Sequence, residues 1–339
     1  MTLKLVLQDK APAGGRIAQF TFAAADGAPL PAYTAGAHLD FDLGDAGTRS
    51  YSLVDFTPPG EAPASYTIAV QREEDGQGGS KAMHALEPGA EVTVSAPKND
   101  FELCAGDVPV LLLAGGIGVT PIISFAAELD RRGTEFALHY CTRTEALSTF
   151  GAQLSALYGD RVSLWSDDSN PADLQTLIKG AAPGTQIYCC GPKGMIEAVR
   201  ELAAAAGFDH DHVHFELFAS PASHEGDQPF EVEITGTGEV YVIPADKTII
   251  EVLEEAGVDV MYDCQRGDCG ICQCDVVEGI PDHRDVVLSD AEEPVLLGAA
   301  IALIAGKHRR VQVGVSVVTL TVVCAIAAVL LVVVDIGGN

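Results

Sequence analysis

The order of hydrophobic and polar residues divides the chain into regions of different predicted structure. Residues 1–103 carry short alternating segments such as His38–Leu43, separated by glycine, proline and aspartate turns, and this pattern predicts antiparallel strands. From residue 104 the apolar run Val108–Leu113 leads through glycines to a predicted helix at Thr120–Arg132. We therefore expect an antiparallel β-barrel over 1–103 and an α/β domain with a parallel sheet over 104–220.

Residue types at the ends of that helix predict its limits. Thr120 is expected to be the N-cap, with Pro121 at the first helical position and Gly133 just past the end. A second strand, loop and helix follow at Gln186–Cys190 and Lys193–Ala206. This repetition supports the parallel sheet.

A third domain is predicted after a linker at 221–229, which is rich in small polar residues. Two alternating segments, Glu231–Thr235 and Glu239–Ile243, flank a Gly-Thr-Gly turn and predict a hairpin. A helical segment then leads into a cluster of cysteines. The order of hairpin, helix and cysteine loop predicts a compact α+β domain over 230–293.

The last region, 294–339, is a hydrophobic C-terminal segment. Residues 311–334 contain 24 positions without a charge, which is long enough for a candidate transmembrane helix. Lys307, Arg309 and Arg310 precede it and would keep the earlier domains on the cytoplasmic side. A tail translated in the wrong reading frame is the alternative explanation.

Charge and cysteine content narrow the class of protein. The 339 residues include 20 Lys and Arg against 48 Asp and Glu, a formal charge of -28 that excludes binding to nucleic acid. Nine cysteines, an odd number without an evenly paired arrangement, favour a reducing compartment, and the N-terminus carries no apolar core of signal-peptide length. We therefore expect a cytoplasmic protein.

The cysteine cluster has the spacing of a plant-type [2Fe-2S] site. Cys264, Cys269 and Cys272 are separated by four residues and then two, and Gly267 and Gly270 allow the backbone to wrap closely around a cluster. A zinc site would more usually pair two Cys-x-x-Cys hooks. These three cysteines are predicted metal ligands, and the fourth ligand is unknown.

Two glycine-containing loops follow predicted strands of the α/β domain. One runs through Gly115, Gly116, Gly118, Thr120 and Pro121, and the other is Cys190-Gly191-Pro192. Glycines permit close backbone approach, and the N-terminus of a helix favours a pyrophosphate. Two such loops at the carboxyl edge of one sheet indicate a dinucleotide site.

In the predicted barrel, Arg49-Ser50-Tyr51-Ser52 is followed by Gly78-Gly79-Ser80. An arginine can bind phosphate, a tyrosine can lie against a flat ring, and the Gly-Gly-Ser turn offers backbone N–H groups. On residue types alone, an ordinary strand with an exposed arginine is the favoured interpretation.

The combination of these motifs, in this order, resembles the phthalate dioxygenase reductase and vanillate demethylase reductase family, within the ferredoxin-reductase-like flavoproteins, over about residues 1–292. The resemblance implies a ferredoxin-like (β-grasp) fold of the plant-type [2Fe-2S] class for the domain at 230–293. It also implies three cofactors, FMN, NADH and a [2Fe-2S] cluster. It implies catalytic roles for Ser52, Cys190 and Glu216. Cofactor-binding roles are implied for Arg49, Ser50, Tyr51, Ser52, Ala69, Val70, Gly78, Gly79, Ser80, Gly115, Gly116, Gly118, Thr120, Pro121, Gly191, Pro192 and Phe218.

The chain departs from the family at the fourth cluster ligand. In the family a cysteine follows the third ligand by roughly thirty residues, whereas residues 298–302 here contain none. Cys274 and Cys324 are alternative ligands. Cys274 lies two residues after Cys272 on a predicted strand, and Cys324 lies within the apolar tail.

Three functions follow from these observations. The resemblance implies an NADH-dependent oxidoreductase that passes electrons through FMN and the cluster to a Rieske-type or related terminal oxygenase component. An FMN-dependent NADH reductase of another acceptor, with an incomplete cluster domain, is the second. The third is a membrane-tethered or frame-shifted product without electron-transfer activity.

Overall fold

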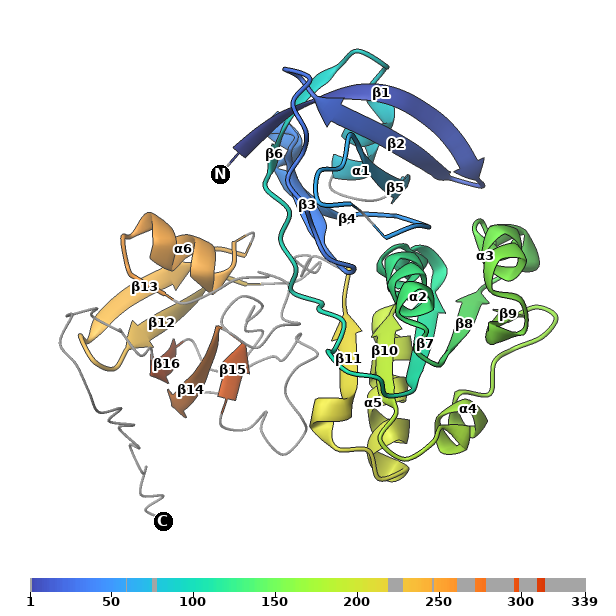
Figure 1. Ribbon diagram of the computed structural model, residues 1–339. Coiled ribbons are helices and arrows are strands. Elements are labelled where there is room, and N and C mark those ends of the chain that lie inside the picture. The colour runs from blue at the N-terminus through green and yellow to red at the C-terminus, as the bar shows by residue number, and fades with distance from the viewer. Residues whose placement is uncertain are drawn as a thin grey trace, which may run out of the picture. The chain divides into compact units, whose positions relative to one another are not determined.

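The computed structural model describes residues 2–58, 60–74, 78–218, 228–245, 247–260, 272–278, 296–298 and 310–314. The chain forms two compact units, Met1–Phe218 and Ala219–Asn339. Two sheets belong to the first unit and one belongs to the second (Figure 1). Each unit is described separately below.

The N-terminal sheet is antiparallel and has the strand order β4-β3-β6-β1-β2-β5. An antiparallel bridge between Leu53 and Ile68 joins the end of β4 to β5, so the two outer strands meet and close the predicted barrel. Its interior is filled by apolar side chains, including Phe20, Phe22 and Leu39. The strands and helix are β1 (Thr2–Gly14), β2 (Ile17–Ala24), β3 (His38–Asp42), β4 (Thr48–Ser52), β5 (Tyr66–Gln71), α1 (Gly79–Ala85) and β6 (Glu91–Ser95).

The second sheet is fully parallel, as predicted, with the order β11-β10-β7-β8-β9. Helices α2 and α3 cover the face toward the barrel, and α4 and α5 lie on the other face (Figure 1). The elements are β7 (Val110–Gly115), α2 (Val119–Arg132), β8 (Phe136–Thr142), α3 (Gly151–Tyr158), β9 (Val162–Ser166), α4 (Leu174–Gly180), β10 (Gln186–Cys190), α5 (Lys193–Ala205) and β11 (Val213–Glu216).

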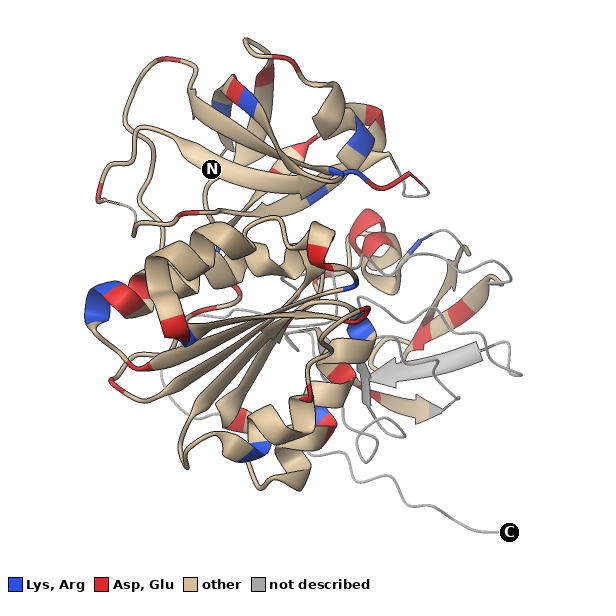
Figure 2. Ribbon diagram, turned by 90° about the vertical axis from the view of Figure 1, so that its right-hand side faces the viewer, with Lys and Arg blue, Asp and Glu red and all other residues tan. Residues whose placement is uncertain are grey.

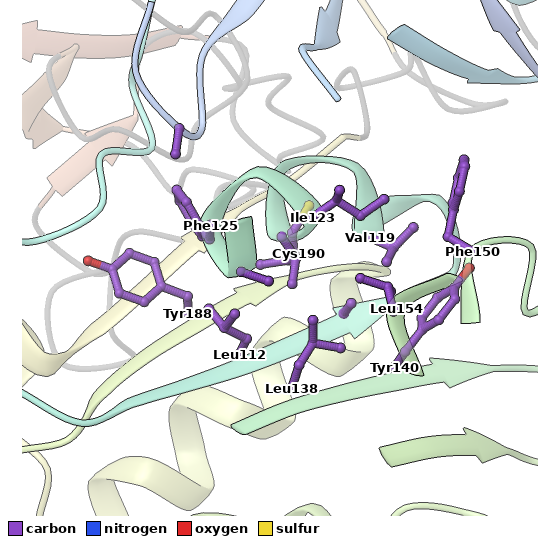
Figure 3. Close-up of a cluster of buried hydrophobic side chains, with 14 of the residues drawn as sticks. Leu112, Val119, Ile123, Phe125, Leu138, Tyr140, Phe150, Leu154, Tyr188 and Cys190 are labelled. Carbon is purple, nitrogen blue, oxygen red and sulfur yellow. The ribbon is translucent and has the colours of Figure 1, made fainter. Parts of the chain in front are cut away.

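One apolar cluster extends from the parallel sheet into the barrel. Figure 3 shows its central part, in which Leu112 and Leu138 of the sheet face Ile123 and Phe125 of α2. Val54, at the end of the barrel strand β4, belongs to the same cluster. Shared burial of this kind explains why the barrel and the α/β domain form one compact unit.

The start of α2 differs from the prediction at Thr120. A 3-10 turn at Gly116–Gly118 leads directly into the helix, so α2 begins at Val119 and Gly118 occupies the N-cap position. Thr120 lies inside the first turn, where its hydroxyl donates to the carbonyl of Ile117 at 3.0 Å. The predictions of Thr120 as N-cap and of Pro121 as the first helical residue were both wrong, because Val119 begins the helix. Gly133 ends the helix in a left-handed conformation, as expected.

The second unit contains a mixed sheet with the order β13-β12-β16-β14-β15. Helix α6 begins with a capping box between Thr248 and Glu251, and its buried residues pack with Phe230 and Val232. The elements are β12 (Phe230–Ile234), β13 (Glu239–Ile243), α6 (Ile249–Glu255), β14 (Gln273–Glu278), β15 (Leu296–Gly298) and β16 (Arg310–Gly314). This arrangement agrees with the predicted α+β domain.

Two of these strands come from the segment predicted to be a separate tail. β15 pairs with β14, and β16 lies between β12 and β14, so the sheet extends beyond the expected boundary at residue 293. The candidate membrane helix at 311–334 starts within β16, and its residues from 315 onward lie outside the described part of the chain. Among the described residues, no helix has the length and apolar character needed to cross a membrane.

Candidate functional site

The first part of the candidate site lies where β4 meets the start of α1. A Cβ on Gly79 would approach Cγ of Arg49 to 2.6 Å, so the arginine side chain lies directly on the glycine. Gly78 precedes the helix in a left-handed conformation, with φ at 94°. Because Gly79 has no side chain, Arg49 can lie beside the first turn of α1.

Ser52 carries a strong sign of a missing polar partner. Its side chain is 4% exposed, and its Oγ atom has no hydrogen-bond partner among the described residues. A buried hydroxyl without a partner is unfavourable by about 1–3 kcal/mol. A ligand atom that bonds to Ser52 would remove this cost.

Ala69 and Val70 lie beside Ser52 because the Leu53–Ile68 bridge joins the end of β4 to β5. Both are buried, and a ring nitrogen of His84 in α1 lies 2.9 Å from the carbonyl oxygen of Val70. Strand β5 and helix α1 are therefore held together at the same place as Arg49 and Ser52. The structure brings these predicted residues into one cradle.

Tyr51 and Ser80 border this cradle. The Tyr51 ring packs edge-on against Phe41 with ring centres 5.6 Å apart. Burial raises the pKa of Tyr51 to about 12, with a smaller opposing effect of Arg49, so the phenol is neutral at physiological pH. The Oγ atom of Ser80 accepts a hydrogen bond from the backbone N–H of Glu73 at 3.0 Å.

Ser50 has a different environment from its neighbours in the motif. Its hydroxyl donates to Oδ1 of Asp40 on β3 at 2.6 Å. Hydrogen bonds from Ser50 and Lys98 hold the pKa of Asp40 below its usual range, against the opposing effect of burial. The Ser50 hydroxyl is therefore used within the barrel, and its predicted contact with a cofactor stays a prediction.

The second part of the site is formed by the loops after β7 and β10. A Cβ on Gly118 would come within 2.3 Å of the carbonyl oxygen of Cys190, and one on Gly115 within 2.7 Å of Cδ of Pro192. A Cβ on Gly191 would lie 3.0 Å from Cα of Gly115. The two loops thus touch through their backbones, and only glycine fits at these contacts.

Gly116 is the other glycine of the first loop and has φ at 57°, with open space where a side chain would stand. The backbone N–H groups at the start of α2 follow it, next to the buried residues Thr120 and Pro121. A loop of this shape before a helix of 14 residues is suited to a phosphate group. The geometry agrees with the predicted dinucleotide site.

Cys190 and Glu216 end neighbouring parallel strands and face each other in the register of β10 and β11. Cys190 is fully buried in the apolar cluster beside Ile123 (Figure 3), so its placement alone does not identify a catalytic thiol. Glu216 is 2% exposed and is the only Asp, Glu, Lys or Arg in the five strands of the sheet, which Figure 2 shows as nearly free of charge. A carboxylate buried in an otherwise uncharged sheet is a candidate for a functional role, and the predicted catalytic role of Glu216 stays a prediction.

Phe218 follows two residues after Glu216 and is 37% exposed. It is the last described residue of the first unit. A large exposed aromatic ring at the carboxyl edge of the sheet is available for contact with a ligand.

The predicted cluster site is only partly described. Cys264 and Cys269 lie outside the described residues, and Cys272 is buried at 6% exposure just before β14. Cys274 packs against the apolar core of the second unit, and burial raises the pKa of its thiol to about 12. Cys274 is half-buried and lies close in sequence to Cys272, and its role as the fourth ligand stays a prediction.

Opposite the cysteines, β15 runs antiparallel to β14 and pairs Gly298 with Gln273. This strand carries Leu296, Leu297 and Gly298, none of which can bind iron. Within the described ranges, no three His, Cys, Asp or Glu residues gather in a way that could hold a metal ion. The described residues therefore do not complete a four-thiolate site.

Comparison with sequence families divides the chain in the same way. Residues 232–299 match the 2Fe-2S iron-sulfur cluster binding domain family, and residues 99–213 match the N-terminal domain of the dimethylamine monooxygenase subunit DmmA-like family. The first match includes the three spaced cysteines. The second includes both glycine loops.

Individual proteins are similar over most of their length. The chain is 40% identical to the vanillate O-demethylase oxidoreductase of Pseudomonas sp. (strain HR199 / DSM 7063) over 297 residues, which cover 86% of this chain and 90% of the relative. It is 35% identical to the heme-dependent oxidative N-demethylase beta subunit of Ectopseudomonas mendocina (strain ymp) over 264 residues, covering 78% and 84%.

A solved structure supports the same assignment. Phthalate dioxygenase reductase, described as a modular structure for electron transfer from pyridine nucleotides to [2Fe-2S], matches with a TM-score of 0.71 and 31% identity. The match covers 93% of this chain and 98% of that protein. Together with the cradle on the barrel and the paired glycine loops, these similarities show that the chain belongs to the family of reductase components of oxygenase and demethylase systems that includes vanillate O-demethylase oxidoreductase and phthalate dioxygenase reductase.

Proposed function

We propose that the chain is an NADH-dependent flavin reductase that supplies electrons to a terminal oxygenase or demethylase component. FMN, when bound, would accept a hydride from NADH and release the electrons singly. The observation that carries the proposal is the buried Ser52 hydroxyl, which has no partner among the described residues and lies in the same compact unit as the contacting glycine loops after β7 and β10.

The roles of individual residues follow from this placement. Arg49, together with the first turn of α1, would hold the FMN phosphate, and Ser52 would bond to the flavin ring next to Ala69 and Val70. The two glycine loops would hold the NADH pyrophosphate through backbone N–H groups. The preference for NADH over NADPH rests on the family resemblance alone.

Cys190, Glu216 and Phe218 would lie near the meeting point of nicotinamide and flavin. Cys190 ends β10, which carries the second nucleotide loop, and Glu216 and Phe218 end and follow the neighbouring strand β11. We assign Glu216 to the reaction centre on its burial in an otherwise uncharged sheet. The role of Cys190 stays a prediction from the family.

The test is anaerobic reduction of the purified protein, reconstituted with FMN, by NADH. We expect the oxidised flavin absorbance to disappear after one equivalent of NADH, and steady-state reduction of an artificial acceptor such as ferricyanide. A protein that holds FMN and is not reduced by NADH contradicts the proposal.

A second candidate is an NADH reductase that uses FMN without a complete cluster. The observation that favours it is the third sheet, where β15 pairs with β14 and contributes only Leu296, Leu297 and Gly298. Counts of iron and acid-labile sulfide per chain distinguish the two candidates. About two of each per chain support a [2Fe-2S] cluster held by Cys264, Cys269, Cys272 and one further ligand.

The partner protein and the cellular location are proposed only in general terms. A Rieske-type oxygenase fits the phthalate dioxygenase reductase similarity, whereas the N-demethylase relative is named for a heme-dependent system. Membrane association through residues 311–334 stays a prediction, and fractionation of the intact chain tests it. Sequencing the encoding DNA around residue 293 tests the alternative of a frame-shifted, non-functional product.

A further inference from the structure

Ser124 is a polar residue in the middle of an apolar helix face. It is 3% exposed and lies between Ile123 and Phe125 of α2, both of which are fully buried. A buried hydroxyl in such a position is stable only when it forms hydrogen bonds. Its partners belong to the barrel and not to the α/β domain.

The hydroxyl of Ser124 makes two hydrogen bonds to one short segment. It donates to the carbonyl oxygen of Leu53 at 2.8 Å and accepts from the backbone N–H of Asp55 at 3.2 Å. Leu53 is the residue that directly follows Ser52 at the end of β4. The Ser124 side chain thus holds the backbone next to Ser52, the proposed flavin contact.

The other N–H groups of this segment are fixed by the barrel itself. The N–H of Leu53 donates to Ala37 and that of Val54 donates to Thr67, both at 2.8 Å. Ser124 therefore acts on a segment that is already rigid within the barrel. Movement of α2 and of the end of β4 relative to each other would break both of its hydrogen bonds.

The same helix also carries the nucleotide loop. The turn at Gly116–Gly118 leads into α2, and Ser124 is the sixth residue of that helix. The distance along the helix from its first residue, Val119, to Ser124 is about 7.5 Å at the usual rise per residue. A rigid element of less than two turns therefore connects the proposed NADH site to the strand that presents Ser52.

From this geometry we propose that Ser124 is a positioning residue for hydride transfer. By holding α2 against Leu53 and Asp55, it fixes the loop that binds NADH relative to the strand that binds the flavin. The proposal rests on the proposed function, because it concerns the alignment of the same two cofactors.

Loss of this alignment should lower the rate of hydride transfer more than it lowers the affinity for NADH or FMN. Transfer between two held reactants is sensitive to their geometry, and a shift of about 1 Å can lower a rate about 100-fold. Ser124→Ala removes both hydrogen bonds and leaves the Leu53 carbonyl and the Asp55 N–H without this partner. We expect the rate constant for flavin reduction to fall about 10- to 100-fold, with little change in the affinity for NADH or FMN.

The experiment is anaerobic rapid mixing of the full-length, FMN-reconstituted protein with NADH. The measured quantities are the limiting rate constant of flavin reduction, the NADH concentration at half-maximal rate and the charge-transfer absorbance before reduction. Ser124→Ala is compared with Ser124→Thr, which keeps the hydroxyl and is expected to recover most of the rate. Thr185→Val is the control, because Thr185 is equally buried at 3% and precedes β10 at the opposite end of the sheet.

The outcomes distinguish a failure of the positioning role of Ser124 from a failure of the proposed function. A slow Ser124→Ala variant with weakened charge-transfer absorbance, unchanged NADH affinity and a fast Thr185→Val control supports the positioning role. An unchanged rate in Ser124→Ala, or an equal loss in Thr185→Val, overturns it. If the wild-type protein binds FMN and is not reduced by NADH, the proposed function itself fails.

A milder variant keeps the proposal testable if Ser124→Ala does not retain FMN. Ser124→Cys preserves the size of the side chain and offers a weaker S–H donor. A limiting rate constant of flavin reduction below that of the wild type is then expected. A wild-type rate in Ser124→Cys, together with a fast Thr185→Val control, overturns the proposal.

Discussion

Gly118 lies so close to Cys190 that a single added carbon atom would overlap the cysteine backbone. A Cβ atom at residue 118 would lie 2.3 Å from the carbonyl oxygen and 2.6 Å from the carbonyl carbon of Cys190. These residues belong to different loops, which are separated in sequence by the chain from α2 through β10 and are brought together by the parallel pairing of β7 with β10. The two nucleotide loops thus form one structural unit.

Gly118→Ala is expected to separate the loops. The overlap involves backbone atoms, so the loops must move, and we expect a loss of unfolding free energy of about 1–3 kcal/mol together with weaker NADH binding. Gly180→Ala at the end of α4 is the matched control, because nothing lies within 4 Å of its added Cβ. Equal NADH affinity in the two variants would contradict the role of this contact.

Gly79→Ala is expected to displace Arg49 without breaking the helix. Alanine is favourable in the first turn of a helix, whereas its Cβ would overlap Cγ of Arg49. We expect FMN to bind about 10- to 100-fold more weakly, corresponding to a lost charge-assisted hydrogen bond, and riboflavin to bind as before. Fluorescence titration with both flavins measures this. Gly60→Ala, in open space, serves as the control.

Local structure was predictable from the sequence where turn and capping residues such as glycine and proline mark the ends of strands and helices. The strand at Gln186–Cys190 was predicted to the residue, and the strand predicted at His38–Leu43 ends one residue earlier, at Asp42. Thr120 was misplaced because the glycines before it form a 3-10 turn that continues into the helix. The last residue of this turn, Gly118, lies against Cys190, and local sequence does not contain a contact between such distant residues.

Long-range pairing explains the other differences. The valine-rich segment from residue 311 was predicted to begin a membrane helix, yet Arg310–Gly314 pairs with β12 and β14. A short apolar run is compatible with a buried strand or with a membrane helix, and only its partners decide between them. Ser124 was also missed, although a single polar residue in an apolar helix is a usable signal of a buried hydrogen bond.

Ser52→Ala separates a structural role of the hydroxyl from a catalytic one. Because the Oγ atom is buried without a partner in the described part of the chain, its removal is expected to leave the stability of the flavin-free protein unchanged or slightly increased. The rate of FMN reduction by NADH is expected to fall about 10- to 100-fold. Thermal unfolding of the flavin-free chain and rapid mixing of the reconstituted chain measure the two effects. A large loss of stability would indicate a structural hydroxyl instead.

The pH dependence of stability should depend on His139. Burial lowers the pKa of His139 below its ordinary value, and the indole N–H of Trp165 donates to its Nδ1 atom at 3.1 Å. Protonation of Nδ1 would break that hydrogen bond. His214 has a pKa lowered by burial and, less strongly, by His210 and His212.

Since the folded-state pKa of His139 is lower than the unfolded value of about 6.5, the unfolded chain binds more protons below that pH. Unfolding free energy should therefore fall as the pH decreases from about 7.5 to 5.5, by at most about 1.4 kcal/mol per pH unit for each histidine, because each ring binds at most one more proton in the unfolded chain. Fluorescence of Trp165, the single tryptophan, reports denaturant unfolding of this unit. His139→Gln keeps an acceptor for the indole without the titration, so its stability should decline less steeply with acidification. An identical slope in the variant would show that the acid sensitivity arises elsewhere.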